Sequence, residues 1–228
     1  MNTEFLSRIR IILHPISKAF SGLVYPPYVG CPFCGRETVL LENGLCEDCT
    51  SSLCYADMQN VPAPLSGLYS LYQYTGAARN AVLRFKYSQA TYLADIFAKQ
   101  LSIPSEWHFD CIIPVPLHRS RLKKRGYNQS EMLADAISVL YNGIPVRPGW
   151  LKRIKRTRPQ QGLSEAMRKH NLKGVFLASP SVSGLSILLV DDVTTTGTTL
   201  CCCADELIRK GASSVYAVTV CSVPKTAE

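Results

Sequence analysis

The sequence predicts an α/β protein in which a mostly parallel sheet is flanked by helices and preceded by a small four-cysteine module. Strand-like apolar runs alternate with helical patterns through the second part of the chain, which is typical of a parallel sheet covered on both faces. One such run, Ser186–Val190, leads directly into two adjacent acids. Nearer the N-terminus, four cysteines form two Cys-x-x-Cys pairs, a spacing that indicates a metal site.

The composition is that of a folded protein with anionic partners. The 228 residues are 46% hydrophobic and 18% charged, which excludes a disordered or fibrous chain. The net charge of +8 fits nucleic acid, a phosphorylated small molecule or an acidic membrane surface as the partner. No stretch is long and apolar enough to span a bilayer, so we expect no transmembrane segment.

Three regions are expected along the chain: residues 1–24, 25–60 and 61–228. In the first, apolar residues between Phe5 and Phe20 follow helical spacing and predict an amphipathic helix. That helix would either cap the cysteine module or dock on a membrane surface or a partner. The second region is the cysteine module, and the third is expected to form one α/β domain.

Periodicity and turn residues assign the elements of the third region. Helices are expected at Ala77–Leu101, Ser130–Leu140 and Leu200–Lys210. Strands are expected at Cys111–Val115, Ile144–Val146, Gly174–Leu177, Ser186–Val190 and Val215–Val220. Either Asn128 or Ser130 would cap the second helix, and Gly211 would end the third.

The two cysteine pairs predict a closed metal site. Cys31 and Cys34 form the first pair, and Cys46 and Cys49 form the second after eleven intervening residues. Four thiolates around one ion is the tetrahedral arrangement that structural zinc prefers. An iron–sulfur cluster is the alternative, because four cysteines also hold those. A closed four-cysteine site leaves no position for a substrate, so we expect this module to stabilise the protein or bind a partner.

The strongest local signal for ligand binding follows the strand at Ser186–Val190. A loop of threonines and one glycine separates the two acids from the next helix, where free backbone N–H groups and the helix dipole favour a phosphate. The acids would repel that phosphate and suit the vicinal hydroxyls of a ribose. The alternative is an acid pair of the receiver or metal-binding kind. The candidate residues are Asp191, Asp192, Thr194, Thr195, Thr196, Gly197, Thr198 and Thr199.

Two further segments are rich in cations. Residues 114–129 hold five Lys and Arg side chains and no acid, and a second cationic segment begins at Arg153. Fixed cations beside the first site would stabilise the charge that develops on a leaving pyrophosphate. A solvated basic face is the alternative. The candidate cations, which we expect to lie on loops, are Arg119, Arg121, Lys124, Arg125, Arg158 and Arg168.

The segment over residues 187–199 resembles the fingerprint by which type I phosphoribosyltransferases bind 5-phosphoribosyl-1-pyrophosphate (PRPP). Further motifs resemble the ComF/ComFC (GntX-like) competence family: Cys-Pro-Phe-Cys-Gly, Pro-Val-Pro-Leu-His, Arg-Gly-Tyr-Asn-Gln and Gln-Gln-Gly-Leu-Ser, in this order along nearly the whole chain. The resemblance implies a type I phosphoribosyltransferase fold. It also implies that Asp191 and Asp192 hold the ribose hydroxyls, that Thr194–Thr199 grips the 5-phosphate, and that Arg153–Arg168 closes over PRPP.

The same resemblance implies a cellular role and partners. It describes a bacterial protein of the cytoplasm, or of the inner membrane face, that handles single-stranded DNA during natural transformation beside a ComFA-like helicase. Magnesium would accompany PRPP, held by ligand oxygens and water. The basic segments and Tyr127 would suit a single strand, because cations track phosphates and an aromatic ring can stack on a base.

Three kinds of function are compatible with these residues. The protein is an enzyme that transfers phosphoribose, a binding protein that keeps the PRPP fold, or a regulator that senses PRPP. No residue is assigned as a general base, and His118 is the nearest histidine to the site by sequence position. The run Cys201–Cys203 is interpreted as packing at the start of a helix.

Overall fold

The computed structural model describes residues 30–56, 61–155 and 174–224. They belong to two compact units, Met1–Ser51 and Ser52–Glu228. The helix expected within residues 1–24 lies outside the described residues, as do the candidate cations Arg158 and Arg168. In the described part, the helices are all too short or too polar to cross a membrane.

The first unit is small and its described core consists mostly of cysteine. One helix, α2 (Glu47–Ser51), starts directly after Cys46 and carries Cys49 on its buried side. Phe33 and Leu45 are the apolar side chains, cysteines aside, that are buried in the described part of this unit. So small a core provides little hydrophobic stabilisation, and units of this size commonly depend on a metal or a disulfide.

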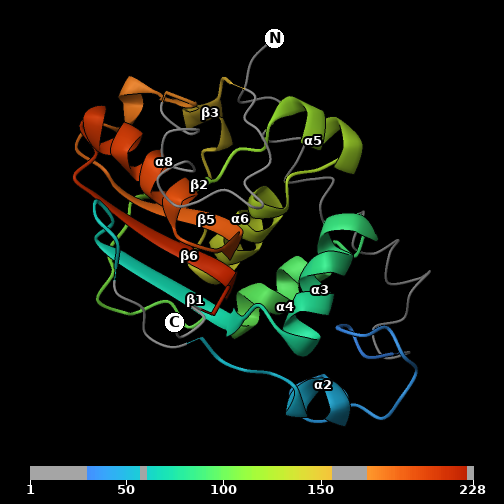
Figure 1. Ribbon diagram of the computed structural model, residues 1–228. Coiled ribbons are helices and arrows are strands. Elements are labelled where there is room, and N and C mark those ends of the chain that lie inside the picture. Colours follow the sequence, from blue (N-terminus) through green and yellow to red (C-terminus); the bar gives the residue numbers. More distant parts are fainter. Residues whose placement is uncertain (1–29, 57–60, 156–173, 225–228) are drawn as a thin grey trace. The chain divides into compact units, whose positions relative to one another are not determined.

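The second unit is built on a four-stranded parallel sheet, as the sequence predicted (Figure 1). Its strands are β1 (Gly67–Gln73), β2 (Cys111–Pro114), β5 (Ser186–Thr194) and β6 (Ser214–Ser222). They lie in the order β1-β6-β5-β2, and all three pairings are parallel. Because β5 and β6 occupy the centre, their buried runs are apolar on both faces.

Helices cover the sheet on both sides (Figure 1). The longer ones are α3 (Gly76–Tyr87), α4 (Leu93–Gln100), α6 (Gln129–Leu140) and α8 (Thr198–Arg209), and α5 (Arg119–Arg125) is a short one. Helix α6 contacts β2 and β5, α3 contacts β1 and β6, and α4 packs on α6. Beside α8 lies a two-stranded antiparallel sheet of β3 (Leu151–Arg153) and β4 (Phe176–Ala178), with the 3-10 turns η1 (Pro148–Trp150) and η2 (Pro180–Val182) next to these strands.

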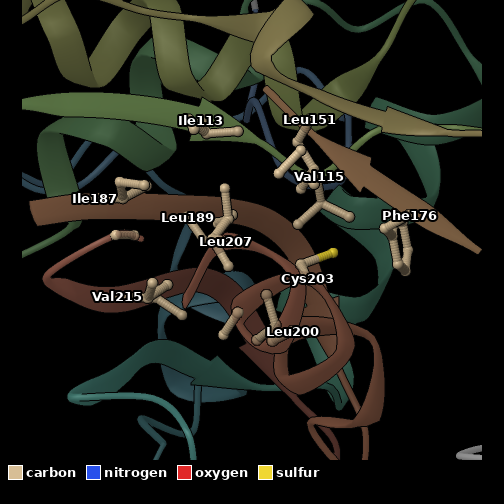
Figure 2. Packing of buried hydrophobic residues seen from close by; sticks show 14 of the residues in the cluster. Ile113, Val115, Leu151, Phe176, Ile187, Leu189, Leu200, Cys203, Leu207 and Val215 are labelled. Carbon is tan, nitrogen blue, oxygen red and sulfur yellow. The ribbon is translucent and has the colours of Figure 1, made fainter. Parts of the chain in front are cut away.

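One core cluster joins the sheet to α8 (Figure 2). Side chains along a strand alternate between faces, so Ile187 and Leu189 of β5 point to the same side. They pack there with Leu207 and Cys203 of α8. Burial raises the pKa of Cys203 well above its usual value, so this thiol stays neutral. Cys203 is thus a core residue and Cys202 packs against the same cluster, as the packing interpretation expected.

Several elements differ from those that the sequence predicted. The helix expected over Ala77–Leu101 is two helices, α3 and α4, and Gln89 between them adopts a left-handed conformation at φ 54°. The strand expected at Ile144–Val146 is reduced to one bridge between Ile112 and Val146. Strand β5 runs past the expected end at Val190 to Thr194, so it includes both acids and the first threonine of the expected loop.

The first basic segment is a helix, where we expected a loop. His118 caps α5 by accepting a hydrogen bond from the Ser120 backbone at Nδ1 (3.2 Å). Gly126 ends the helix in the left-handed conformation at φ 83°, which glycine adopts without strain. The cap of α6 was predicted correctly: Asn128 accepts from the Ser130 backbone N–H at 3.2 Å.

We expect Leu189→Ala to lower the free energy of unfolding by about 2–5 kcal/mol, because it opens a cavity under the central strand. Leu189 is fully buried between α8 and the neighbouring strands. Urea unfolding followed by circular dichroism measures the change. Val139→Ala, at an exposed position on α6, is the control, with an expected change below about 0.5 kcal/mol. Similar changes in the two variants would contradict this account of the core.

Candidate functional site

The candidate ligand site lies where the strands of the parallel sheet end. Carboxyl ends of parallel strands share one edge, and in open α/β sheets ligands bind outside that edge. At this edge β5 contributes Asp191, Asp192 and Thr194, and α8 begins four residues after β5 ends. Helix α5 also belongs to this edge, because it starts five residues after β2 ends. The fold thus gathers the acids, the threonine turn and the first basic segment.

Asp191 is held by two hydrogen bonds. Its Oδ1 accepts from the hydroxyl of Ser130, the second residue of α6, and from the backbone N–H of Asp192, both at 2.9 Å. Burial and the neighbouring charge of Asp192 raise the pKa of Asp191 to about 7, although these hydrogen bonds and Lys86 oppose the shift. A carboxyl with such a pKa exchanges its proton near neutral pH, a property that clusters at functional sites.

Asp192 points toward α3, where it meets a lysine that sequence reasoning missed. Lys86 Nζ lies 2.9 Å from Asp192 Oδ1, and the two side chains are only 15% and 12% exposed. Burial disfavours the charged ammonium, but the two acids outweigh it and raise the pKa of Lys86. One signal for this lysine was available: it follows Val82 by four residues, which places it on the buried face of α3.

The turn between β5 and α8 presents hydroxyls and a glycine. Gly197 has φ 75°, a conformation that other residues rarely adopt, and it starts α8. Thr196 and Thr198 share a hydrogen bond of 2.6 Å between their hydroxyl oxygens. Thr195 and Thr196 are exposed, Thr199 is half-buried, and the Thr194 hydroxyl is buried without a partner among the described residues. The first N–H groups of α8 have no partner within the helix, as at any helix start.

The basic residues of α5 fall into two groups. Arg119, Arg121 and Lys124 are exposed, and none of the residues of α5 is buried. Arg125 is held by two hydrogen bonds, which it donates to Gln129 Oε1 at 2.9 Å and to the hydroxyl of Tyr87 at 3.1 Å. Its guanidinium also lies 5.0 Å from the centre of the Tyr87 ring. It anchors α5 to α3 and α6, while the other cations remain available to an anion.

Arg153, the first cation of the second basic segment, lies on β3 with its guanidinium 5.7 Å from the centre of the Phe176 ring. Burial and the nearby Arg121 lower its pKa, and Asp191 acts in the opposite sense. Arg153 therefore lies within electrostatic reach of both Arg121 and Asp191. The two basic segments therefore converge near the acids in the described part of the chain.

Two tyrosines lie near the basic helix α5, and their exposure differs. Tyr127, the predicted stacking residue, is half-buried: its hydroxyl donates to the Phe85 carbonyl at 2.5 Å and its ring packs on Phe85. This contact holds the ring of Tyr127 against α3, and its stacking on a base stays a prediction. Tyr87, at the end of α3, is 62% exposed and lies beside the cations of α5. Sequence reasoning overlooked it.

The four predicted cysteines form one compact cluster in the first unit. The Sγ atoms of Cys31, Cys34, Cys46 and Cys49 all lie within 4.8 Å of one another. The sulfurs of Cys34 and Cys46 are 3.8 Å apart, which matches the ~3.8 Å edge of a tetrahedron with zinc–sulfur bonds of ~2.3 Å. Burial raises the pKa of Cys34, but hydrogen bonds with Arg36 outweigh it and lower that pKa to about 6. The donor set fits a metal ion.

Comparison with known proteins agrees with this geometry. The phosphoribosyl transferase domain model matches residues 88–228. The DNA utilization protein YhgH of Salmonella typhi is 31% identical over 208 residues, covering 84% of this chain and 89% of that protein. Competence protein ComFC of Bacillus subtilis is 28% identical over 198 residues, covering 83% and 76%.

Among solved structures, the glutamine PRPP amidotransferase of B. subtilis, complexed with ADP and GMP, superposes with a TM-score of 0.40 at 19% identity, covering 60% of this chain and 30% of that one. The family model spans the strands β2, β5 and β6 together with the acids and the threonine turn. The chain therefore belongs to the phosphoribosyl transferase domain family and, within it, to the ComF-like proteins represented by ComFC and YhgH.

Proposed function

We propose that the carboxyl edge of the sheet binds PRPP and that the protein handles single-stranded DNA in natural transformation. The observation that carries the first part is the placement of Asp191 and Asp192 at the end of β5, four residues before the glycine-started helix α8. The ribose hydroxyls would donate to these acids. The 5-phosphate would accept hydrogen bonds from the hydroxyls and backbone N–H groups of residues 194–199.

The pyrophosphate would be met by the cations that the fold directs to the same edge. Arg119, Arg121 and Lys124 of α5 are exposed there, and Arg158 and Arg168 of the second basic segment are proposed to complete the set. Magnesium would be held by the oxygens of PRPP and by water. These cations would stabilise the charge of a leaving pyrophosphate if an acceptor attacks the anomeric carbon. His118 caps α5 through Nδ1, so we do not assign it as a general base.

The double variant Asp191→Asn/Asp192→Asn is expected to weaken PRPP binding at least ~100-fold. It replaces two carboxylate acceptors, each worth about 1.5–3 kcal/mol in hydrogen bonds to charged groups, by weaker amides of the same shape. Isothermal titration calorimetry with PRPP and Mg²⁺ measures the affinity. Asp205→Asn removes an exposed carboxylate from α8 and serves as the control. Affinity within threefold of the wild type in the double variant would refute the proposed ribose contacts.

For the cysteine cluster we propose structural zinc. The four sulfurs are close enough together for a single ion, and a cluster of several irons would need a wider opening between them. Bound zinc would supply the cross-link that the small core of this unit lacks.

One zinc ion per chain is the expected result of elemental analysis on purified protein. Cys46→Ser should lose it, because serine is a poor zinc ligand, and a strong chelator should expose the first unit to proteolysis. Cys54→Ser is the matched control, since that exposed cysteine lies outside the cluster. Iron in place of zinc, with visible absorption, would overturn the assignment.

A second activity, the binding of single-stranded DNA, is favoured by the surface formed by α5 and Tyr87. Helix α5 exposes Lys123 and Lys124 beside Arg119 and Arg121, and Tyr87 presents a ring that is 62% exposed. Proteins that bind single-stranded DNA commonly combine cations that contact the DNA phosphates with an aromatic side chain that stacks on a base. The names of the relatives YhgH and ComFC, which refer to DNA utilization and competence, support the same role. We extend the proposal to a ComFA-like helicase partner and a cytoplasmic location, at the inner membrane face.

We expect the affinity for an oligo-dT strand to fall steeply with salt. Lys123→Gln/Lys124→Gln should reduce the slope of log K against log salt by about 1.4, since each lost contact with single-stranded DNA contributes ~0.7. Fluorescence anisotropy over a salt series measures it. Lys99→Gln on α4 is the control and should leave the slope unchanged. A salt-independent affinity, or an equal effect of the control, would contradict the proposed surface.

A further inference from the structure

Lys86 lies directly at the site, although it precedes the residues that match the phosphoribosyl transferase domain model. It forms an ion pair with one of the two acids: its Nζ lies 2.9 Å from Asp192 Oδ1. Its neighbours on α3, Val82 and Phe85, are fully buried apolar side chains. A charged residue therefore occupies the end of a face that is otherwise built for the core.

We propose that Lys86 is a positioning residue of the PRPP site: it fixes Asp192 through Oδ1 so that Oδ2 accepts a ribose hydroxyl, and its positive charge offsets the negative charge of the two acids when the anionic ligand arrives. This inference rests on the proposed binding of PRPP. A carboxylate has lone pairs for several donors, so one oxygen held by an ammonium leaves the other for the ligand.

Stability alone does not account for this ion pair. Burying two charges costs free energy of desolvation, and the mutual attraction of such a pair frequently only offsets that cost. An apolar side chain at position 86 would extend the packing of Val82 and Phe85 without it. The Lys86–Asp192 pair is instead explained by the ligand site that it adjoins, where the orientation of a carboxylate decides binding.

The electrostatics of the site give Lys86 a second role. The groups that interact electrostatically with Asp192 are Lys86 of α3, Cys221 of β6 and Asp191. Lys86 also interacts with Tyr74, which precedes α3. Asp191 is faced by Ser130 of α6, Arg153 of β3 and Cys203 of α8, in addition to Asp192 and Lys86.

In this set Lys86 lowers the pKa of Asp191, which burial and Asp192 raise to about 7. A folded-state pKa raised in this way means that Asp191 takes up a proton as the pH falls through about 7, and the ribose hydroxyls then lose an ionised acceptor. Removing Lys86 should move the loss of ligand affinity to higher pH.

The test compares Lys86→Met, Lys86→Gln and Lys86→Arg with the wild type, by calorimetric titration with PRPP and Mg²⁺ between pH 6 and 9. Lys86→Met should bind at least tenfold more weakly at pH 7, and the ratio of the two affinities should shrink as the pH rises. PRPP's own protonation cancels in this ratio, because both proteins meet the same ligand. Lys86→Arg keeps the charge and should stay within threefold. Lys99→Met, on the exposed side of α4, is the control.

The outcomes distinguish a failure of the proposed PRPP binding from a failure of the proposed role of Lys86. If the wild type does not bind PRPP, the proposed function fails and this inference falls with it. If the wild type binds and Lys86→Met shows the same affinity and pH profile, only the role of Lys86 is refuted. Lys86→Gln carries the same test should the methionine variant not fold, because it removes the charge and keeps a polar chain of similar length. A pH-independent loss in both variants would also refute the electrostatic role.

Discussion

The paired carboxylates at the end of β5 are the constraint on which the rest of the site depends. Two adjacent acids at the edge of a buried sheet repel each other and resist desolvation, so the surrounding elements must compensate them. Helix α3 supplies Lys86 to Asp192, and α6 supplies the hydroxyl of Ser130 to Asp191. These contacts, together with β5 itself, connect three elements that lie far apart in the sequence.

This arrangement explains why the ligand site and the core cannot be separated. The strand that carries the acids is one of the two central strands of the sheet, and its apolar half packs on α8 (Figure 2). Helix α8 in turn begins at the threonine turn that would receive the phosphate. The same packing that stabilises the domain therefore aligns the acids with the helix start. The basic helix α5 is joined to this frame by Arg125, which leaves its other cations exposed.

The first unit follows a different principle of stability. Its described core is so small that the cysteine cluster takes the place of a hydrophobic interior. Nothing in the cluster's chemistry is needed at the carboxyl edge, since a closed four-sulfur site has no open position for a ligand. The proposed anion site and the cysteine cluster thus lie in separate units of one chain.

The sequence by itself determined the features that short, contiguous patterns carry. The four cysteines were found by their spacing, and β5, the turn at Gly197 and α8 by an apolar run followed by acids, threonines and a glycine. Residue order is enough here, because backbone geometry links neighbours directly. The capping of α6 by Asn128 was predictable for the same reason.

Only the tertiary structure decided which distant residues meet those patterns. Lys86, near the end of α3, lies 2.9 Å from Asp192 of β5, and a contact between residues so far apart in the sequence leaves no periodic signal. Tyr127 is half-buried because its ring packs on Phe85 of α3, whereas Tyr87 at the end of that helix stays exposed. Burial and long-range charge depend on packing, and packing is a property of the whole fold.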